Sequence, residues 1–109
     1  MHRIRRVNQM VRHVIVWTLK EEYTRDQKKE IISGIKEGLE GLKGTVPGLT
    51  EIHVYGERLA SSNTDLMLDS YFENEEALKG YSVHPAHVKV AEEKVRPFTS
   101  IRSCFDFEV

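Results

Sequence analysis

Apolar residues recur with a period of two in the first strongly patterned stretch of the chain, residues 10–20. Val11 and Ile15 fall on one face of this stretch, and Val14 and Val16 fall on the other. A strand that is apolar on both faces is typical of a sheet that is covered on both sides. The pattern therefore predicts a strand buried from two directions.

The next stretch changes to the period of a helix. Ile31 and Ile35 belong to an apolar stripe with helical spacing, and charged residues fill the opposite face. Thr24 and Gln27 precede this stripe in the arrangement of a capping box, in which each side chain bonds the backbone N–H of the other residue. The sequence predicts a helix that begins after Thr24 and ends at a cap formed by Gly44.

The rest of the chain alternates strand and helix signals. Asn74 is a suitable N-cap, Pro85 is suited to a first helical position, and Pro97 ends the last helical pattern. The resulting order is β-α-β-β-α-β, a ferredoxin-like α+β arrangement with helices on one face of a four-stranded antiparallel sheet. The expected elements after the first helix are strands at 49–57, 65–72 and 100–109 and helices at 75–81 and 85–95.

A sheet with helices on one face leaves its other face uncovered. The last strand again has two apolar or mixed faces, with Ile101, Phe105 and Phe107 on one side and Cys104 on the other. An uncovered apolar face is most simply buried against a second copy of the same sheet. We therefore expect a homodimer.

Length and charge narrow the class of protein. The 109 residues suffice for one domain, and the net charge of −1 with mixed signs gives no basic surface for nucleic acid or anionic membrane. We expect one domain at residues 10–109, preceded at 1–9 by a flexible tail or an extended start. Apolar runs stay below the roughly 20 residues that a membrane span needs.

Cysteine use suggests a cellular compartment. Cys104 is the sole cysteine, so no disulfide can form within the chain. This is compatible with a reducing cytoplasm, and we expect a cytoplasmic protein.

Candidate chemistry gathers around the predicted start of the last helix. Tyr81, His84 and His87 lie within seven residues, with Pro85 supplying the turn between them. His87 would lie in the first helical turn, where the helix dipole disfavours a protonated ring. A neutral imidazole can act as a general base near neutral pH. The alternative is that these rings cap and pack without chemistry.

Several segments together resemble one known family. They are the opening 10–17 (MVRHVIVW), the turn 46–48 (VPG), the run 70–76 (SYFENEE), the block 84–88 (HPAHV) and the closing 105–108 (FDFE). Across residues 10–109 they resemble the stress-responsive A/B barrel (Dabb) family. The resemblance implies a dimeric α/β barrel, in which two four-stranded sheets close face to face.

The resemblance also implies candidate site residues. Plant members include polyketide cyclases, in which a tyrosine, a histidine and an aspartate act in a pocket between sheet and helices; Tyr81, His87 and Asp106 match those positions. For a ring-closing aldol reaction, His87 would be the base, Asp106 its orienting partner and Tyr81 the oxyanion donor. The expected pocket residues are His13, Ile15, Trp17, Ile31, Ile35, Leu68, His84 and Cys104.

Three functions stay open at this point. The chain could bind a small hydrophobic or aromatic ligand, act as a cofactor-free cyclase-like lyase, or be a stress protein whose barrel is filled by Trp17. The Tyr81, His87 and Asp106 group could equally be a buried hydrogen-bonded network without catalysis. His84 and His87 have a spacing that permits a metal, which His13 or Asp106 could join as a further ligand. No second strong ligand pair accompanies them, so we expect no metal or cofactor.

Overall fold

The computed structural model describes residues 9–109. Within this part, β1 (Val11–Leu19), α1 (Arg25–Glu40), β2 (Leu49–Tyr55), β3 (Leu66–Phe72), α2 (Glu75–Val83), α3 (Pro85–Val90) and β4 (Thr99–Glu108) follow in order. Between α3 and β4 lie a π-helical turn, η1 (Ala91–Val95), and a 3₁₀ turn, η2 (Arg96–Phe98). All neighbouring strands pair antiparallel in the order β2-β3-β1-β4. The ferredoxin-like α+β prediction is confirmed.

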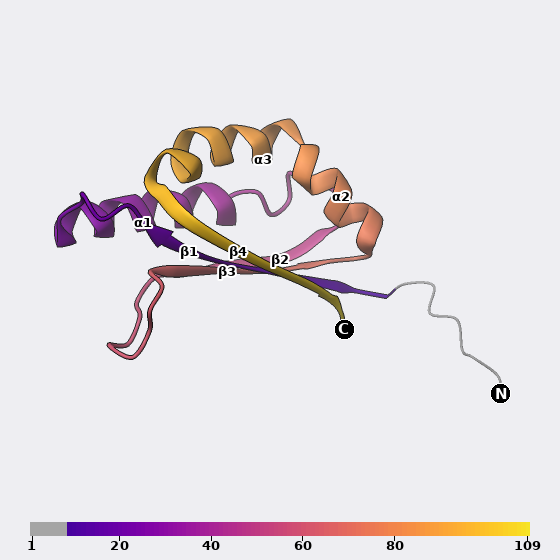
Figure 1. The fold of residues 1–109 in the computed structure, drawn as a ribbon. Coiled ribbons are helices and arrows are strands. Elements are labelled where there is room, and N and C mark those ends of the chain that lie inside the picture. Colours follow the sequence, from indigo (N-terminus) through magenta and orange to yellow (C-terminus); the bar gives the residue numbers. More distant parts are fainter. Residues whose placement is uncertain (1–8) are drawn as a thin grey trace.

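The helices lie on one side of the sheet (Figure 1). The loop between β2 and β3 projects on the opposite side, away from the helices (Figure 1). No helix among residues 9–109 covers this second face, which we call the open face. None of the helices in the same range is both long and apolar enough to cross a bilayer.

Burial along the central strand β1 follows the period of two. Ile15, Trp17 and Leu19 are buried on the helix face, whereas Val14 and Val16 on the open face are half-buried. The buried side chains pack against α1, where Ile35 and Leu39 are almost fully enclosed. One hydrophobic core between the sheet and the helices therefore holds the domain together.

The starts of the helices are fixed by side-chain caps. The Gln27 backbone N–H donates to Thr24 Oγ1 at 3.2 Å, and the Thr24 N–H donates to Gln27 Oε1 at 2.9 Å. Asn74 Oδ1 accepts from the Ala77 N–H at 2.9 Å in the same way for α2. These caps satisfy N–H groups that have no partner inside the helix, and both predicted starts are confirmed.

The predicted end of the first helix is wrong by about one turn. Helix α1 ends at Glu40, and the N–H of Gly41 bonds back to the carbonyls of Glu37 and Leu39. Gly44 lies in the following turn with φ +88°, a conformation that glycine adopts without strain. Gly44 therefore serves the turn toward β2 and does not cap the helix.

The last predicted helix is interrupted. Regular α-helical structure ends at Val90, and residues Ala91–Val95 form a π-helical turn. Such a turn inserts one extra residue per hydrogen-bonded ring and shifts the side chains that follow it. The first and last residues of this turn, Ala91 and Val95, are both buried.

The predicted N-terminal tail, residues 1–9, lies outside the described residues except at Gln9. The Gln9 side-chain amide donates to the Val109 carbonyl at 2.6 Å.

Gly48, at the turn into β2, gives a test of this packing. It has φ +80°, and an added Cβ would lie 2.5 Å from the Ala77 Cβ. Gly48→Ala should therefore lower the free energy of unfolding by about 1–3 kcal/mol. In the matched variant Gly34→Ala, the added Cβ meets nothing within 4 Å inside α1. That change should stabilise the protein by about 0.5–1 kcal/mol. Urea unfolding at equal protein concentration measures both, and a neutral Gly48→Ala would contradict the described turn.

Candidate functional site

A cavity of about 310 Å³ lies between the helix face of the sheet and the segment from α2 to η1. Ile15 and Trp17 of β1 and Leu68 of β3 line the side that the sheet provides. Tyr81 of α2 and His87 of α3 line the opposite side. Trp17 therefore forms part of the wall and leaves the space open.

One polar atom of each of the cavity residues Tyr81 and His87 lacks a hydrogen-bond partner. The two rings stack in a tilted arrangement, with centroids 4.1 Å apart. Tyr81 Oη and His87 Nδ1 are buried, and within the described part of the chain neither has a hydrogen-bond partner. A buried polar group without a partner costs roughly 1–3 kcal/mol. Two such atoms on residues that line one cavity call for a ligand or ordered water as their partner.

Burial also sets the protonation states of these two rings. It raises the pKa of the Tyr81 hydroxyl, against a smaller opposing effect of Arg102. It lowers the pKa of His87, and Arg96, His13 and Arg102 act in the same direction, while the Ser82 carbonyl opposes them. At neutral pH the phenol is therefore a donor and the imidazole a neutral ring able to accept a proton.

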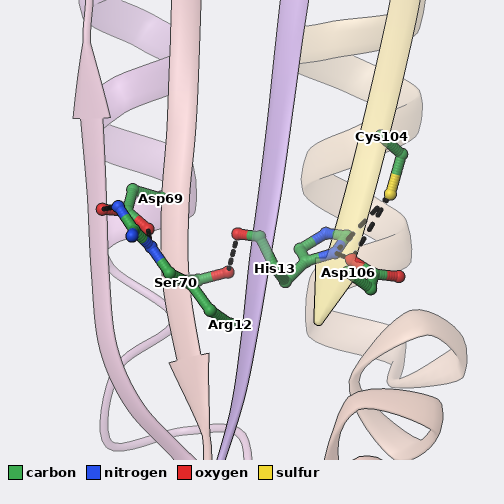
Figure 2. A network of polar contacts seen from close by, with 6 residues as sticks. All are labelled: Arg12, His13, Asp69, Ser70, Cys104 and Asp106. Atoms are coloured by element: carbon green, nitrogen blue, oxygen red, sulfur yellow. Dashed lines mark hydrogen bonds and ion pairs between the residues drawn. The ribbon is translucent and has the colours of Figure 1, made fainter. Parts of the chain in front are cut away.

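The sequence led us to expect a hydrogen bond between Asp106 and His87. In the structure, Asp106 is hydrogen-bonded to His13 instead (Figure 2). His13 and Asp106 lie directly opposite each other in the β1–β4 register, and directly opposed side chains on one face are close enough to interact. Cys104 Sγ donates to Asp106 Oδ1 at 3.4 Å. The expected support of His87 by Asp106 is therefore absent from the described structure, because strand pairing assigns Asp106 to another histidine.

The His13 group and the Tyr81 group are nevertheless neighbours. The His13 ring lies edge-on to Tyr81, with centroids 6.1 Å apart, and edge-on to Phe72 at 6.2 Å. The His13 carbonyl also accepts a hydrogen bond of 3.1 Å from Ser70 Oγ (Figure 2). His13 is only 6% exposed, so these contacts hold its ring in one orientation.

The remaining expected pocket residues lie outside the cavity wall. Ile35 is fully enclosed in the main core, and Ile31 packs against that core. His84 caps α3 through its Nδ1, which accepts from the Ala86 N–H at 3.1 Å. Cys104 lies on β4, exposed, beside Asp106.

Two arginines at the cavity were not singled out by the sequence. Arg96 and Arg102 line it from η2 and β4, and both are exposed to solvent. Arg102 has the same strand face as Cys104 and Asp106, so a period of two could have indicated it. The spacing of residues in the sequence could not have indicated Arg96. The π-helical turn before it changes the direction in which its side chain leaves the helix.

A wider groove of about 1210 Å³ lies elsewhere, between α1, β2 and the loop that follows β2. Arg25, Lys29 and Arg58 line it and are exposed. Solvated charges of this kind are usual on a protein surface, and the unpartnered buried atoms noted above lie at the smaller cavity. We therefore treat the smaller cavity as the candidate site.

Comparison with known proteins finds the same ferredoxin-like fold in proteins that are described as dimeric. The sequence model of the family described as Stress responsive A/B Barrel Domain matches residues 11–109. A dimeric protein of unknown function and ferredoxin-like fold from Bacteroides fragilis is 25% identical, with a TM-score of 0.85, and the match covers 92% of this chain and 96% of the other. No curated protein matches the sequence.

Two more distant structures have the same fold. A Dabb family protein with a ferredoxin-like fold from Mesorhizobium loti is 20% identical, with a TM-score of 0.70 and coverage of 91% of this chain and 95% of the other. The hydroxynitrile lyase from Passiflora edulis is 15% identical, with a TM-score of 0.71 and coverage of 94% of each chain. At these identities the similarity establishes the fold alone.

The lowered pKa of His87 predicts a pH-dependent stability. Because the folded pKa lies below the unfolded value of about 6.5, the unfolded state binds more protons in this window. The free energy of unfolding should then fall as the pH drops below about 6.5. His87→Gln should flatten this dependence, measured by urea unfolding between about pH 5 and pH 7.5.

His53→Gln is the matched control, because His53 lies on the edge strand β2, away from the cavity. It should leave the slope of stability against pH close to that of the wild type. Equal slopes for His87→Gln and His53→Gln would contradict the burial of His87.

Proposed function

The chain belongs to the stress responsive A/B barrel (Dabb) domain family, and from this premise we propose a homodimer in which each protomer binds a small organic molecule between sheet and helices. The observation that carries this proposal is the pair of unpartnered buried atoms, Tyr81 Oη and His87 Nδ1, beside an apolar cavity. A ligand hydroxyl group would provide both with partners, accepting from the Tyr81 hydroxyl and donating to an unprotonated His87 Nδ1.

The size and walls of the cavity indicate the kind of ligand. About 310 Å³ is at the small end of the range of roughly 300–1,000 Å³ found for ligand pockets. Ile15, Trp17 and Leu68 favour a hydrophobic or aromatic body. Arg96 and Arg102 at the exposed side favour an acidic group directed toward solvent. A small aromatic or hydrophobic acid fits these walls best.

The open face supports the proposed dimer. Tyr55, Ile101 and Phe105 are 53%, 61% and 68% exposed there. One pair of charges on this face is already matched, since Arg12 Nε and a second guanidinium nitrogen donate to the two Asp69 oxygens, each at 2.8 Å. These two charges can be buried at an interface without either losing its partner. Two sheets packed by their open faces would form the α/β barrel of the family.

A cofactor-free lyase or cyclase is the second candidate. The specific observation in its favour is the neutral His87 ring against the Tyr81 phenol, 4.1 Å between centroids. His87 could remove a proton alpha to a carbonyl, and the Tyr81 hydroxyl could donate to the oxygen on which charge develops. The absence of an Asp106 contact to His87 leaves this base without the orienting carboxylate expected from the sequence.

A sealed stress protein is less compatible with a cavity that Trp17 leaves open.

We also propose that the protein works in a reducing compartment such as the cytoplasm. Its only cysteine, Cys104, is exposed and unpaired. An exposed thiol of this kind persists where the surroundings keep it reduced.

Ligand binding is tested by a thermal-shift screen of small aromatic and polyketide-like acids. A true ligand should raise the melting temperature in proportion to the logarithm of its concentration. Tyr81→Phe removes one hydrogen bond, worth about 0.5–1.5 kcal/mol, and should weaken binding roughly 2- to 12-fold. Turnover of the same compound, lost in His87→Gln, would assign the lyase alternative.

His53→Gln, at the far edge of the sheet, is the control and should bind like the wild type. Failure of every compound to stabilise the wild type, or equal binding by Tyr81→Phe and His53→Gln, would contradict the proposed ligand site.

The dimer is tested by placing a charge on the open face. Phe105→Glu should shift the protein from dimer to monomer at micromolar concentration, because an unpaired carboxylate would have to be buried. Val83→Glu is the matched control, since Val83 is 74% exposed at the end of α2, on the helix side of the sheet. Light scattering coupled to gel filtration measures the mass, and a Phe105→Glu variant that stays dimeric would contradict this interface.

A further inference from the structure

Three side chains with metal-binding atoms meet at the His13 end of β1. His13 Nδ1, Cys104 Sγ and a carboxylate oxygen of Asp106 all lie within 4.8 Å of one another. Sγ is 3.8 Å from His13 Nδ1 and 3.4 Å from Asp106 Oδ1 (Figure 2). The three side chains come together from two paired strands, His13 from β1 and the other two from β4 (Figure 2).

Strand pairing fixes this arrangement. Asp106 is opposite His13 in the register. Cys104, two residues earlier and opposite Ile15, lies on the same face of β4. The His13 ring is also held edge-on against Phe72 and Tyr81. Ligands that lie on paired strands, one of them a ring fixed by packing, form a preorganised site. Preorganisation lowers the entropy cost of binding an ion.

The two sulfur distances suit a tetrahedral ion, whereas His13 Nδ1 and Asp106 Oδ1 are in direct hydrogen-bond contact and would have to separate around it. Zinc bonds of about 2.3 Å to sulfur and about 2.0 Å to nitrogen or oxygen place tetrahedral ligand atoms roughly 3.3–3.6 Å apart. The two sulfur distances of 3.8 and 3.4 Å are close to these values. An ion at the centre would take the place of the protons now shared between His13, Cys104 and Asp106.

We propose that His13, Cys104 and Asp106 form a binding site for a divalent ion of the zinc class, with one coordination position left open. A mixed nitrogen, sulfur and oxygen set favours zinc or a similar transition metal, whereas Mg²⁺ and Ca²⁺ prefer oxygen ligands alone. Three protein ligands and an open position are the arrangement of zinc sites that bind an exogenous molecule.

Arg102 lies within electrostatic reach of Cys104, and its positive charge repels a cation. Burial and Asp106 raise the pKa of the Cys104 thiol, against a smaller opposing effect of Arg102, so a metal ion has to displace the thiol proton. Because Arg102 also lines the cavity, the proposed metal site and the proposed ligand cavity are neighbours, although the metal proposal does not depend on that ligand.

Titration of the full-length reduced protein with Co²⁺ tests the site. We expect a thiolate-to-cobalt charge-transfer band and intensified visible bands that saturate at one ion per chain and disappear when Zn²⁺ is added. Cys104→Ser should abolish the charge-transfer band, since the chain has no other sulfur of this kind. Asp106→Asn should weaken Co²⁺ binding at least about tenfold. His53→Gln should leave both band and affinity unchanged.

Two results would overturn the proposal. One is a wild-type protein that gives no charge-transfer band with Co²⁺. The other is an Asp106→Asn variant that keeps the charge-transfer band at wild-type affinity. That result would show that Cys104 binds cobalt without Asp106 as a ligand. Cys104 and Asp106 are both exposed, so these variants should retain the fold, and circular dichroism verifies it.

Discussion

The need to cover both faces of the central strand β1 governs this structure. Helices from the same chain cover one face, where Ile15, Trp17 and Leu19 pack against α1. The other face is left to residues such as Val14 and Phe105, which no helix of the described chain covers (Figure 1). The first face holds a core and a cavity, and the second is the proposed interface. The proposed dimer and the proposed ligand site are thus consequences of one constraint on opposite sides of a single sheet.

Chemistry-bearing residues reach the helix face by two different routes. Tyr81 and His87 come from helices and depend on how α2 and α3 lie over the sheet. His13 and Asp106 come from paired strands and depend on the β1–β4 register. Tyr81 lies between the two groups, near His87 on one side and His13 on the other. Their proximity explains why one small volume offers both a neutral acid–base pair and a set of metal-binding atoms.

Local signals made most of the fold predictable from the sequence. Thr24 with Gln27, and Asn74, each fix a helix start through bonds that span only a few residues. Period-two alternation likewise identifies strands without knowledge of their partners. Gly44 misled the prediction because a glycine with positive φ suits a helix cap and a free turn equally well.

The candidate site was less predictable, because it depends on contacts between distant segments. Asp106 lies 93 residues from His13, and only the register of β4 on β1 makes them a pair. Arg96 reaches the cavity after a π-helical turn, which apolar spacing does not reveal. The cavity itself depends on the packing of every element around it, so residue types alone identified only part of its wall.

A high-resolution crystal structure of the protein would test the central claim most directly. The account predicts two sheets packed by their open faces and, in each protomer, a ligand or ordered water bonded to Tyr81 Oη and His87 Nδ1. A closed, dry space in which these two atoms are satisfied by protein groups would contradict it.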